Sequence, residues 1–227
     1  MIRACLFDLD GTLLNTALTI TYFLNLALSR SGISPITVQE AKRFVGDGAR
    51  VLVERALASK AIADSDLCKR VLSVYRRAYD DDPYRLTAPY DGMRETLFAL
   101  RARGVALGVI SNKPDQTAKA VVSRFFPELF GCVLGAREDL PLKPDPRGAR
   151  ALCAALSVDP AQTLYFGDTG VDMQTGRALG AGRTVGVLWG FRDREELQMH
   201  RAQALISHPS EILDLPDIFP HSKEKHA

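Results

Sequence analysis

The sequence predicts an α/β fold built on a Rossmann-like parallel β-sheet with helices on both faces. Short apolar runs typical of buried strands recur along the chain, and helical segments separate most of them. Parallel strands need such crossover connections, and their sheets are covered on both faces. Small or polar residues follow each apolar run, and function is therefore expected at the carboxyl ends of the strands.

The elements of this sheet can be assigned in chain order. The runs that we expect to form strands are residues 4–9, 105–110, 163–166, 184–188 and 204–206. The helical segments between them are residues 92–103, 115–125, 146–156 and 172–179. Gly104 and Gly180 follow two of these segments and are suitable helix stops, because glycine readily takes the left-handed conformation that ends many helices.

A long segment between the first and second predicted strands, about residues 15–85, is expected to be a helical insertion. Leu67, Val71, Tyr75 and Tyr79 recur every four residues, as apolar residues do on one face of a helix. We therefore predict a core made of residues 1–14 and 86–220, a helical cap of residues 15–85, and a disordered tail of residues 221–227.

Composition and charge limit the classes of function. Of the 227 residues, 46% are hydrophobic and 25% are charged, as in ordinary globular enzymes. The net charge of +2 and the lack of a dense basic block argue against nucleic-acid binding. No apolar stretch is long enough to cross a bilayer, and scattered cysteines favour free thiols in a reducing compartment. All four histidines lie near the C-terminus, from His200 onward, which argues against a histidine triad or metal cluster. We expect a cytoplasmic protein.

Two carboxylates lie at the end of the first predicted strand, in the motif Asp8-Leu9-Asp10-Gly11-Thr12. Side chains two residues apart point to the same side of an extended strand, so Asp8 and Asp10 should lie close together. Such close negative charges cannot both stay ionised unless a cation lies between them or one of them holds a proton. A divalent metal would leave Asp8 as a nucleophile, and Asp10 could transfer a proton.

Three more polar clusters lie where strand ends or the loops after them are expected. Ser111 and Asn112 follow the second predicted strand, and a hydroxyl with a backbone amide near a helix start suits phosphate oxygens. Lys143, before the third helical segment, could neutralise the same phosphate. Asp168 and Asp172 follow the third predicted strand and offer oxygen atoms that could bind a hard cation or support its ligands.

This ordered set of motifs resembles the haloacid dehalogenase superfamily, and specifically its phosphatases with a helical cap inserted after the first motif. The resemblance covers nearly the whole chain and leaves out the tail. It implies a phosphomonoesterase that uses Mg²⁺ and forms an aspartyl-phosphate, with Asp8 as nucleophile and Asp10 as general acid/base. The resemblance also implies that Thr12 supports Asp10 and that Ser111, Asn112 and Lys143 bind the phosphate. It implies that Asp8, Asp168 and the backbone carbonyl of Asp10 bind the metal, and that Asp172 supports the metal site.

The cap segment of residues 45–57 resembles that of phosphoglycolate phosphatases. Gly46 and Gly48 would let a loop approach the active site closely, and Arg50 offers a guanidinium for a substrate carboxylate. A solvated arginine at a helix start is the alternative interpretation of Arg50. No lysine stands at this position, which argues against the Schiff-base chemistry of related phosphonate hydrolases, and Asp10 argues against dehalogenation.

The expected reaction is the hydrolysis of 2-phosphoglycolate to glycolate and phosphate. Phosphatases of sugar phosphates or nucleotides and an isomerase of the β-phosphoglucomutase type remain alternatives. A non-catalytic phosphate-binding protein is disfavoured because Asp8, Asp10, Lys143 and Asp168 are all present. The expected partner is a small phosphorylated metabolite, with neither nucleic acid nor membrane, and the expected state is a monomer or homodimer.

Overall fold

A six-stranded sheet forms the centre of the computed structural model, which describes residues 2–216. Its strand order is β5-β4-β1-β6-β7-β8, and all neighbouring strands pair in parallel. The strands are β1 (Ala4–Phe7), β4 (Ala106–Pro114), β5 (Cys132–Ala136), β6 (Thr163–Gly167), β7 (Arg183–Val187) and β8 (Ala204–Ile206). The parallel α/β sheet is confirmed, and only β5, at one edge, was not predicted.

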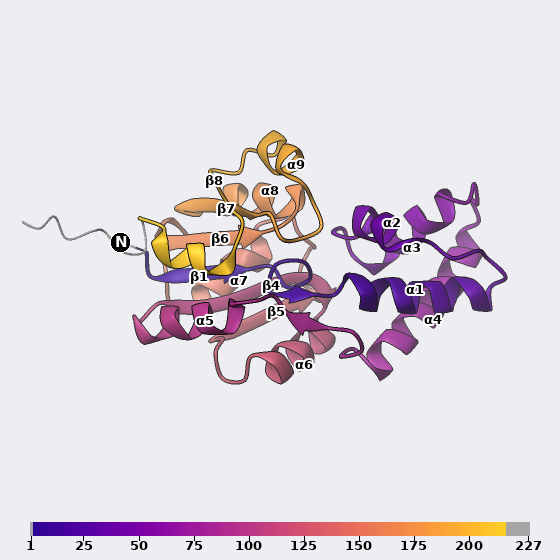
Figure 1. Cartoon of the computed structure of the whole chain (residues 1–227), viewed down its shortest axis with the longest axis horizontal. Coiled ribbons are helices and arrows are strands. Elements are labelled where there is room, and N and C mark those ends of the chain that lie inside the picture. The colour runs from indigo at the N-terminus through magenta and orange to yellow at the C-terminus, as the bar shows by residue number, and fades with distance from the viewer. Residues whose placement is uncertain (1, 217–227) are drawn as a thin grey trace, which may run out of the picture.

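Helices cover both faces of this sheet (Figure 1). They are α5 (Met93–Ala102), α6 (Asp115–Phe125), α7 (Arg147–Ala155) and α8 (Gly170–Leu179), with the shorter α9 (Arg194–Met199) beside α8. Two 3₁₀ turns, η1 (Pro160–Gln162) and η2 (Pro209–Asp214), complete this part of the chain. The predicted stops Gly104 and Gly180 have φ angles of +77° and +81°, which only glycine adopts without strain.

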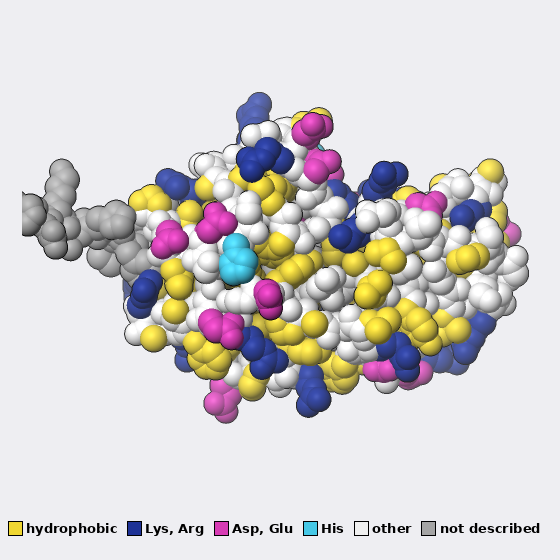
Figure 2. Space-filling view, in the orientation of Figure 1, with side chains coloured by type: hydrophobic (Ala, Val, Ile, Leu, Met, Phe, Trp, Pro, Cys, Tyr) yellow, Lys and Arg dark blue, Asp and Glu magenta, His cyan; other side chains and the backbone are white. Residues whose placement is uncertain are grey.

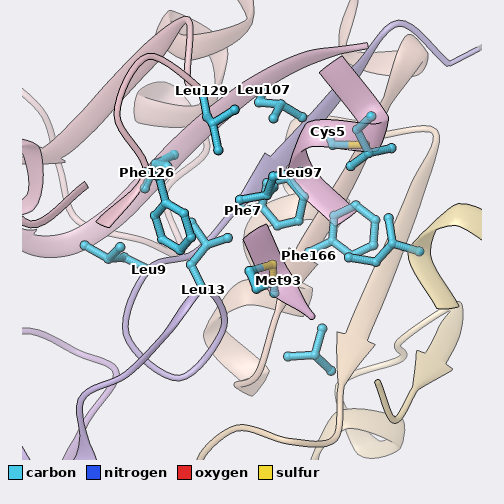
Figure 3. Close-up of a cluster of buried hydrophobic side chains, with 14 of the residues drawn as sticks. Cys5, Phe7, Leu9, Leu13, Met93, Leu97, Leu107, Phe126, Leu129 and Phe166 are labelled. Carbon is cyan, nitrogen blue, oxygen red and sulfur yellow. The ribbon is translucent and has the colours of Figure 1, made fainter. Parts of the chain in front are cut away.

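Alternating side chains of β1 enter two separate apolar clusters. Cys5 and Phe7 belong to the cluster beneath α5 and α6, whereas Leu6 belongs to the cluster beneath α7 and α8. Phe7 stacks on Phe166 of β6 with ring centroids 4.8 Å apart, and Figure 3 shows both rings among the aliphatic side chains of the first cluster. The central strand is thus buried on both faces, and its carboxyl end is held rigidly.

Four helices lie between β1 and α5 in sequence: α1 (Ala17–Arg30), α2 (Val38–Phe44), α3 (Ala49–Ala58) and α4 (Ser65–Asp81). Two short antiparallel strands, β2 (Leu14–Asn15) and β3 (Ala88–Pro89), pair where the chain leaves and re-enters the sheet region. In Figure 1 the four helices lie together beyond the end of the sheet where β1 leads into β2. The predicted stripe on α4 is confirmed, since Val71, Tyr75 and Tyr79 are buried in an apolar cluster made mostly by these helices.

We call the α1–α4 segment the helical insertion. The boundaries predicted for a core and a cap stay a prediction, and the predicted tail of residues 221–227 lies outside the described residues. None of the helices within residues 2–216 is long and apolar enough to cross a membrane. Figure 2 shows basic and acidic side chains interspersed on the face drawn there, without a continuous stripe of one sign.

Candidate active site

A cleft lies between the carboxyl ends of β1 and β4 and the helical insertion. From the sheet region it is lined by Asp8, Asp10, Ser111, Asn112, Lys113, Pro114, Thr117, Lys143 and Thr169. From the insertion it is lined by Ile20, Val45, Gly46, Gly48, Ala49, Leu52, Tyr75, Arg76, Tyr79 and Asp80. Parallel strands place their carboxyl ends at one edge, which is why residues far apart in sequence converge there.

Asp8 follows β1 directly, and its backbone N–H continues the sheet by donating to the carbonyl of Phe166 at 2.9 Å. Asp8 is buried, and its carboxylate lies 2.7 Å from the Nζ of Lys143. Burial and the nearby Asp172 raise the pKa of Asp8 to about 7, although Lys143 opposes this shift. Lys143 is itself buried and lies 2.7 Å from Asp172 as well, so one ammonium serves two carboxylates.

Three buried carboxylates form a cluster that could hold a metal ion. Asp8, Asp168 and Asp172 each offer an oxygen, and these oxygens lie within 4.8 Å of one another. Burial raises the pKa of Asp168 well above its usual range. When all three are ionised, Lys143 offsets only one of the three negative charges, and a hard divalent cation would offset the remainder. The residues therefore fit Mg²⁺.

The predicted metal ligands are the carboxylates of Asp8 and Asp168 and the backbone carbonyl of Asp10, and this set stays a prediction. The third carboxylate of the cluster is that of Asp172, whereas the Asp10 carboxylate faces Lys113. Asp172 is anchored by Thr169, whose backbone N–H and Oγ1 donate to Oδ2 at 3.1 and 2.7 Å as part of a capping box at the start of α8. The role predicted for Asp172, support of the metal site, stays a prediction, and its other oxygen, Oδ1, lies 2.7 Å from the Nζ of Lys143.

Asp168 is fixed from two directions. Thr12 Oγ1 donates to Oδ1 at 3.0 Å, and the backbone N–H of Phe191 donates to Oδ2 at 2.8 Å. Thr12 thus supports Asp168, and not Asp10 as expected, because the chain turns sharply at Gly11 with φ +90°. A side chain at Gly11 would place its Cβ 2.2 Å from Asp168 Oδ2, so the close approach of this turn requires glycine.

Ser111 and Lys113 lie two residues apart at the end of β4, and both are buried and line the cleft. Lys113 was not predicted as a site residue. Its Nζ lies 3.1 Å from both carboxylate oxygens of Asp10 and 2.7 Å from the hydroxyl of Tyr79. The two-residue period of a strand, which places Lys113 on the side of Ser111, is the signal that could have identified it.

Asn112 binds protein groups through its side chain. Its Nδ2 donates to the carbonyls of Gly46 at 2.9 Å and Lys143 at 3.2 Å, and its Oδ1 accepts from the N–H of Lys143 at 2.8 Å. The side chain therefore joins β4, the Lys143 loop and the insertion. A phosphate-binding role at this position rests on its backbone amide.

Of the three insertion residues predicted to contact the substrate, Gly46 and Gly48 line the cleft. Arg50 does not: its side chain is 76% exposed and its Nε pairs with Glu54 at 2.8 Å along the outer side of α3. The structure thus agrees with the alternative interpretation of Arg50 as a solvated residue. Arg76, on α4, lines the cleft instead.

Comparisons with known proteins agree with this geometry. A family model described as haloacid dehalogenase-like hydrolase matches residues 2–180. A phosphoglycolate phosphatase from Cereibacter sphaeroides is 37% identical over 214 residues, which cover 92% of this chain and 95% of that protein. An N-acetylmuramic acid 6-phosphate phosphatase from Pseudomonas aeruginosa is 30% identical, with 95% of each chain covered. The crystal structure of a candidate phosphoglycolate phosphatase from Lactobacillus delbrueckii superposes with a TM-score of 0.89 at 31% identity, covering 92% of this chain and 96% of that one.

Proposed function

The chain belongs to the haloacid dehalogenase-like hydrolases and is a phosphatase, and on this premise we propose that it is a 2-phosphoglycolate phosphatase that uses Mg²⁺ and an aspartyl-phosphate intermediate. The observation that carries the proposal is the pairing of Asp8 with Lys143 at the cleft, within a buried group of three carboxylates. A buried carboxylate at a strand end, beside one cation and open to a cleft, is suited to attack a phosphate that enters from the insertion side.

In the proposed first step, an oxygen of Asp8 attacks phosphorus while the bond from phosphorus to the ester oxygen breaks. Asp10 gives a proton to the departing oxygen, so the alcohol leaves neutral. Lys143, with Ser111 and the Asn112 backbone amide, offsets charge on the phosphoryl oxygens. In the second step Asp10 takes a proton from water, the water oxygen attacks phosphorus, and the bond from phosphorus to the Asp8 oxygen breaks, so that phosphate leaves and the Asp8 carboxylate is restored.

Asp8 and Asp168, with Asp172 beside them and the Asp10 backbone carbonyl carried over from the family, would hold the Mg²⁺. When bound, this cation would supply charge neutralisation for the phosphoryl group and for the clustered carboxylates. Thr12, Thr169 and the N–H of Phe191 keep the acidic side chains oriented toward it.

The substrate follows from the charge left unpaired in the cleft. Lys113 pairs with Asp10 and Lys143 pairs with Asp8 and Asp172, whereas Arg76 has no ion-pair or hydrogen-bond partner among residues 2–216. A free guanidinium beside a phosphate site favours a substrate with a second anionic group, such as a carboxylate. The names of the Cereibacter and Pseudomonas relatives both specify phosphate esters that carry a carboxylate, and N-acetylmuramic acid 6-phosphate is therefore the second candidate substrate.

The test is phosphate release from a panel of esters in the presence of Mg²⁺. We expect the highest kcat/KM for 2-phosphoglycolate, ahead of N-acetylmuramic acid 6-phosphate, glucose 1-phosphate and a nucleoside monophosphate. Preference for the muramic ester would replace the substrate but keep the chemistry. Conversion of glucose 1-phosphate to its 6-phosphate without phosphate release would instead show a mutase, and a lack of turnover on every ester would contradict a catalytic role.

A further inference from the structure

We propose that Lys113 is a positioning residue, which holds the Asp10 carboxylate in place for proton transfer and links it to the helical insertion through Tyr79. This inference rests on the proposed function in one respect, namely that Asp10 is the general acid/base. The motifs that identified Asp8, Asp10, Ser111 and Lys143 do not include Lys113, and no other part of the proposed mechanism uses it.

The first support is the geometry of the ammonium. Lys113 Nζ lies 3.1 Å from Oδ1 and 3.1 Å from Oδ2 of Asp10, so it bridges the carboxylate symmetrically. The torsion that rotates a carboxylate about its last bond has broad minima, and one contact would leave that rotation free. Two equal contacts from a single donor restrict the rotation. The orientation of the Asp10 oxygens is therefore set by Lys113.

The second support is that Lys113 has no donor left for the substrate. An ammonium has three N–H donors, and Lys113 is 8% exposed with three acceptors around it: the two Asp10 oxygens and the hydroxyl of Tyr79 at 2.7 Å. Binding of a phosphate oxygen would require the loss of one of these contacts. Lys113 is therefore expected to act through Asp10, in contrast to Lys143, which faces the nucleophile.

The third support is the origin of the Tyr79 contact. Asp10 and Lys113 belong to the sheet region, whereas Tyr79 comes from α4 of the insertion. Tyr79 is buried against Phe23 and Tyr75, with ring centroids 5.3 and 5.7 Å away, and the Lys113 ammonium lies 4.3 Å above its ring centre. The phenol is therefore a fixed part of the insertion, and a displacement of α4 would remove one of the three acceptors that hold Lys113.

The consequence can be measured through the leaving group. Misplacing the general acid lowers the rate of ester cleavage most when the departing oxygen is a strong base. It lowers that rate little when the oxygen leaves easily as an anion. Phenyl phosphate and p-nitrophenyl phosphate differ little in shape but differ in this property. The ratio kcat/KM reports the steps up to the first irreversible release, which here include protonation of the leaving group, so it isolates the step in question.

The experiment compares Lys113→Met, Tyr79→Phe and Asp10→Asn on these two esters. We expect Lys113→Met to lower kcat/KM at least about tenfold more for phenyl phosphate than for p-nitrophenyl phosphate. Tyr79→Phe, which keeps the ring but removes the acceptor, should show a smaller loss with the same selectivity. Lys119→Met, which removes an exposed lysine from α6, is the matched control and should change neither ester. The inhibition constant for inorganic phosphate should be the same in Lys113→Met as in the unmodified protein.

The possible results separate a failure of the inference about Lys113 from a failure of the proposed function. Equal losses on both esters for Lys113→Met, with a selective loss for Asp10→Asn, would overturn the inference and leave the proposed function intact. A weakened inhibition constant for phosphate would make Lys113 a phosphate-binding residue and would also overturn it. A non-selective Tyr79→Phe would remove the link to the insertion. The absence of selectivity in Asp10→Asn would instead contradict the acid/base role in the proposed function.

Discussion

Arg192 donates a hydrogen bond from Nη2 to the backbone carbonyl of Val45 at 2.6 Å, across 147 residues of sequence. The same guanidinium donates to the carbonyl of Arg43 at 3.1 Å and to that of Lys42, so it satisfies the carbonyls at the end of α2. Its Nε also pairs with Glu196 of α9 at 3.0 Å. Arg192 therefore fastens the loop that carries Gly46 and Gly48, two residues of the cleft, to the sheet region.

Arg192→Ala is expected to loosen this loop. The variant loses several charge-assisted hydrogen bonds to helix-end carbonyls, and we expect a fall of about tenfold in kcat/KM for 2-phosphoglycolate. Amide hydrogen exchange in residues 38–48 should become faster, which mass spectrometry would detect. Arg194→Ala, two residues away and exposed, is the matched control. Unchanged exchange in residues 38–48 of the Arg192 variant would show that the contacts do not hold the loop.

Asp8→Asn is expected to abolish turnover without unfolding the protein. The substitution keeps the volume of the side chain and its hydrogen-bonding reach, but it removes the anionic oxygen that attacks phosphorus. We expect kcat to fall more than about a hundredfold, which corresponds to a loss of about 2.7 kcal/mol or more in the barrier. Circular dichroism would check the fold, and Asp66→Asn, at an exposed position of α4, serves as the control. A smaller loss would contradict the covalent mechanism.

Most of the sheet could be predicted because its strands are continuous apolar runs. The run through Cys5, Leu6 and Phe7 is buried on both faces, as is typical of a central parallel strand. β5 was not predicted because its apolar residues Cys132–Leu134 stand between two glycines, Gly131 and Gly135, and such flanking glycines are typical of turns and loops. Its position at the sheet edge is not the reason, since β8 at the other edge, which has no flanking glycines, was predicted.

Some residues of the site could likewise be predicted from the sequence, and others could not. Asp8 and Asp168 could be placed together because parallel strand ends meet at one edge of a sheet. Arg50 was named in place of Arg76, since helical spacing identifies an apolar face but not which neighbouring polar residue faces a cleft between two parts of the chain. The contacts of Arg192 with the end of α2 have no local signal, because the partners are backbone carbonyls far away in sequence.

The raised pKa values of Asp8 and Asp168 predict a pH dependence of the metal-free protein. In the unfolded chain an aspartic acid titrates near its ordinary pKa of about 3.9, whereas burial raises the pKa of Asp8 to about 7 and that of Asp168 well above its usual range. Between about pH 4 and 7 the folded state thus holds protons that the unfolded state has lost. These groups therefore lower the free energy of unfolding as pH rises through this range.

Mg²⁺ should reverse this loss, because it binds the ionised carboxylates and displaces their protons. We expect the increase in Tm caused by Mg²⁺ over EDTA to be larger at pH 8 than at pH 5.5. At a hundredfold excess over Kd the stabilisation is about 2.7 kcal/mol, or roughly 5–10 °C for a chain of this size. Thermal unfolding at the two pH values measures it, and Asp8→Asn should reduce the difference. An equal increase in Tm at both pH values would contradict the carboxylate site.

Arg76 provides the test of substrate choice. If its guanidinium pairs with the carboxylate of 2-phosphoglycolate, Arg76→Ala should lower kcat/KM for that ester by about 1.5–3 kcal/mol, or roughly ten- to a hundredfold. Hydrolysis of p-nitrophenyl phosphate, which lacks a carboxylate, should change far less. Arg50→Ala is the matched control, because Arg50 lies outside the cleft and pairs with Glu54.

The comparison of the two esters separates a loss of carboxylate binding from a general disturbance of α4. A disturbed α4 would lower the rates on both, because Tyr75 and Tyr79 of that helix also line the cleft. Equal losses in Arg76→Ala would therefore give Arg76 a structural role and leave the substrate carboxylate without a cationic partner on α4. A selective loss in Arg50→Ala with none in Arg76→Ala would mean that α3 turns its first residues toward the substrate during turnover. Only the selective loss in Arg76→Ala fits a carboxylate seated between the phosphate site and α4.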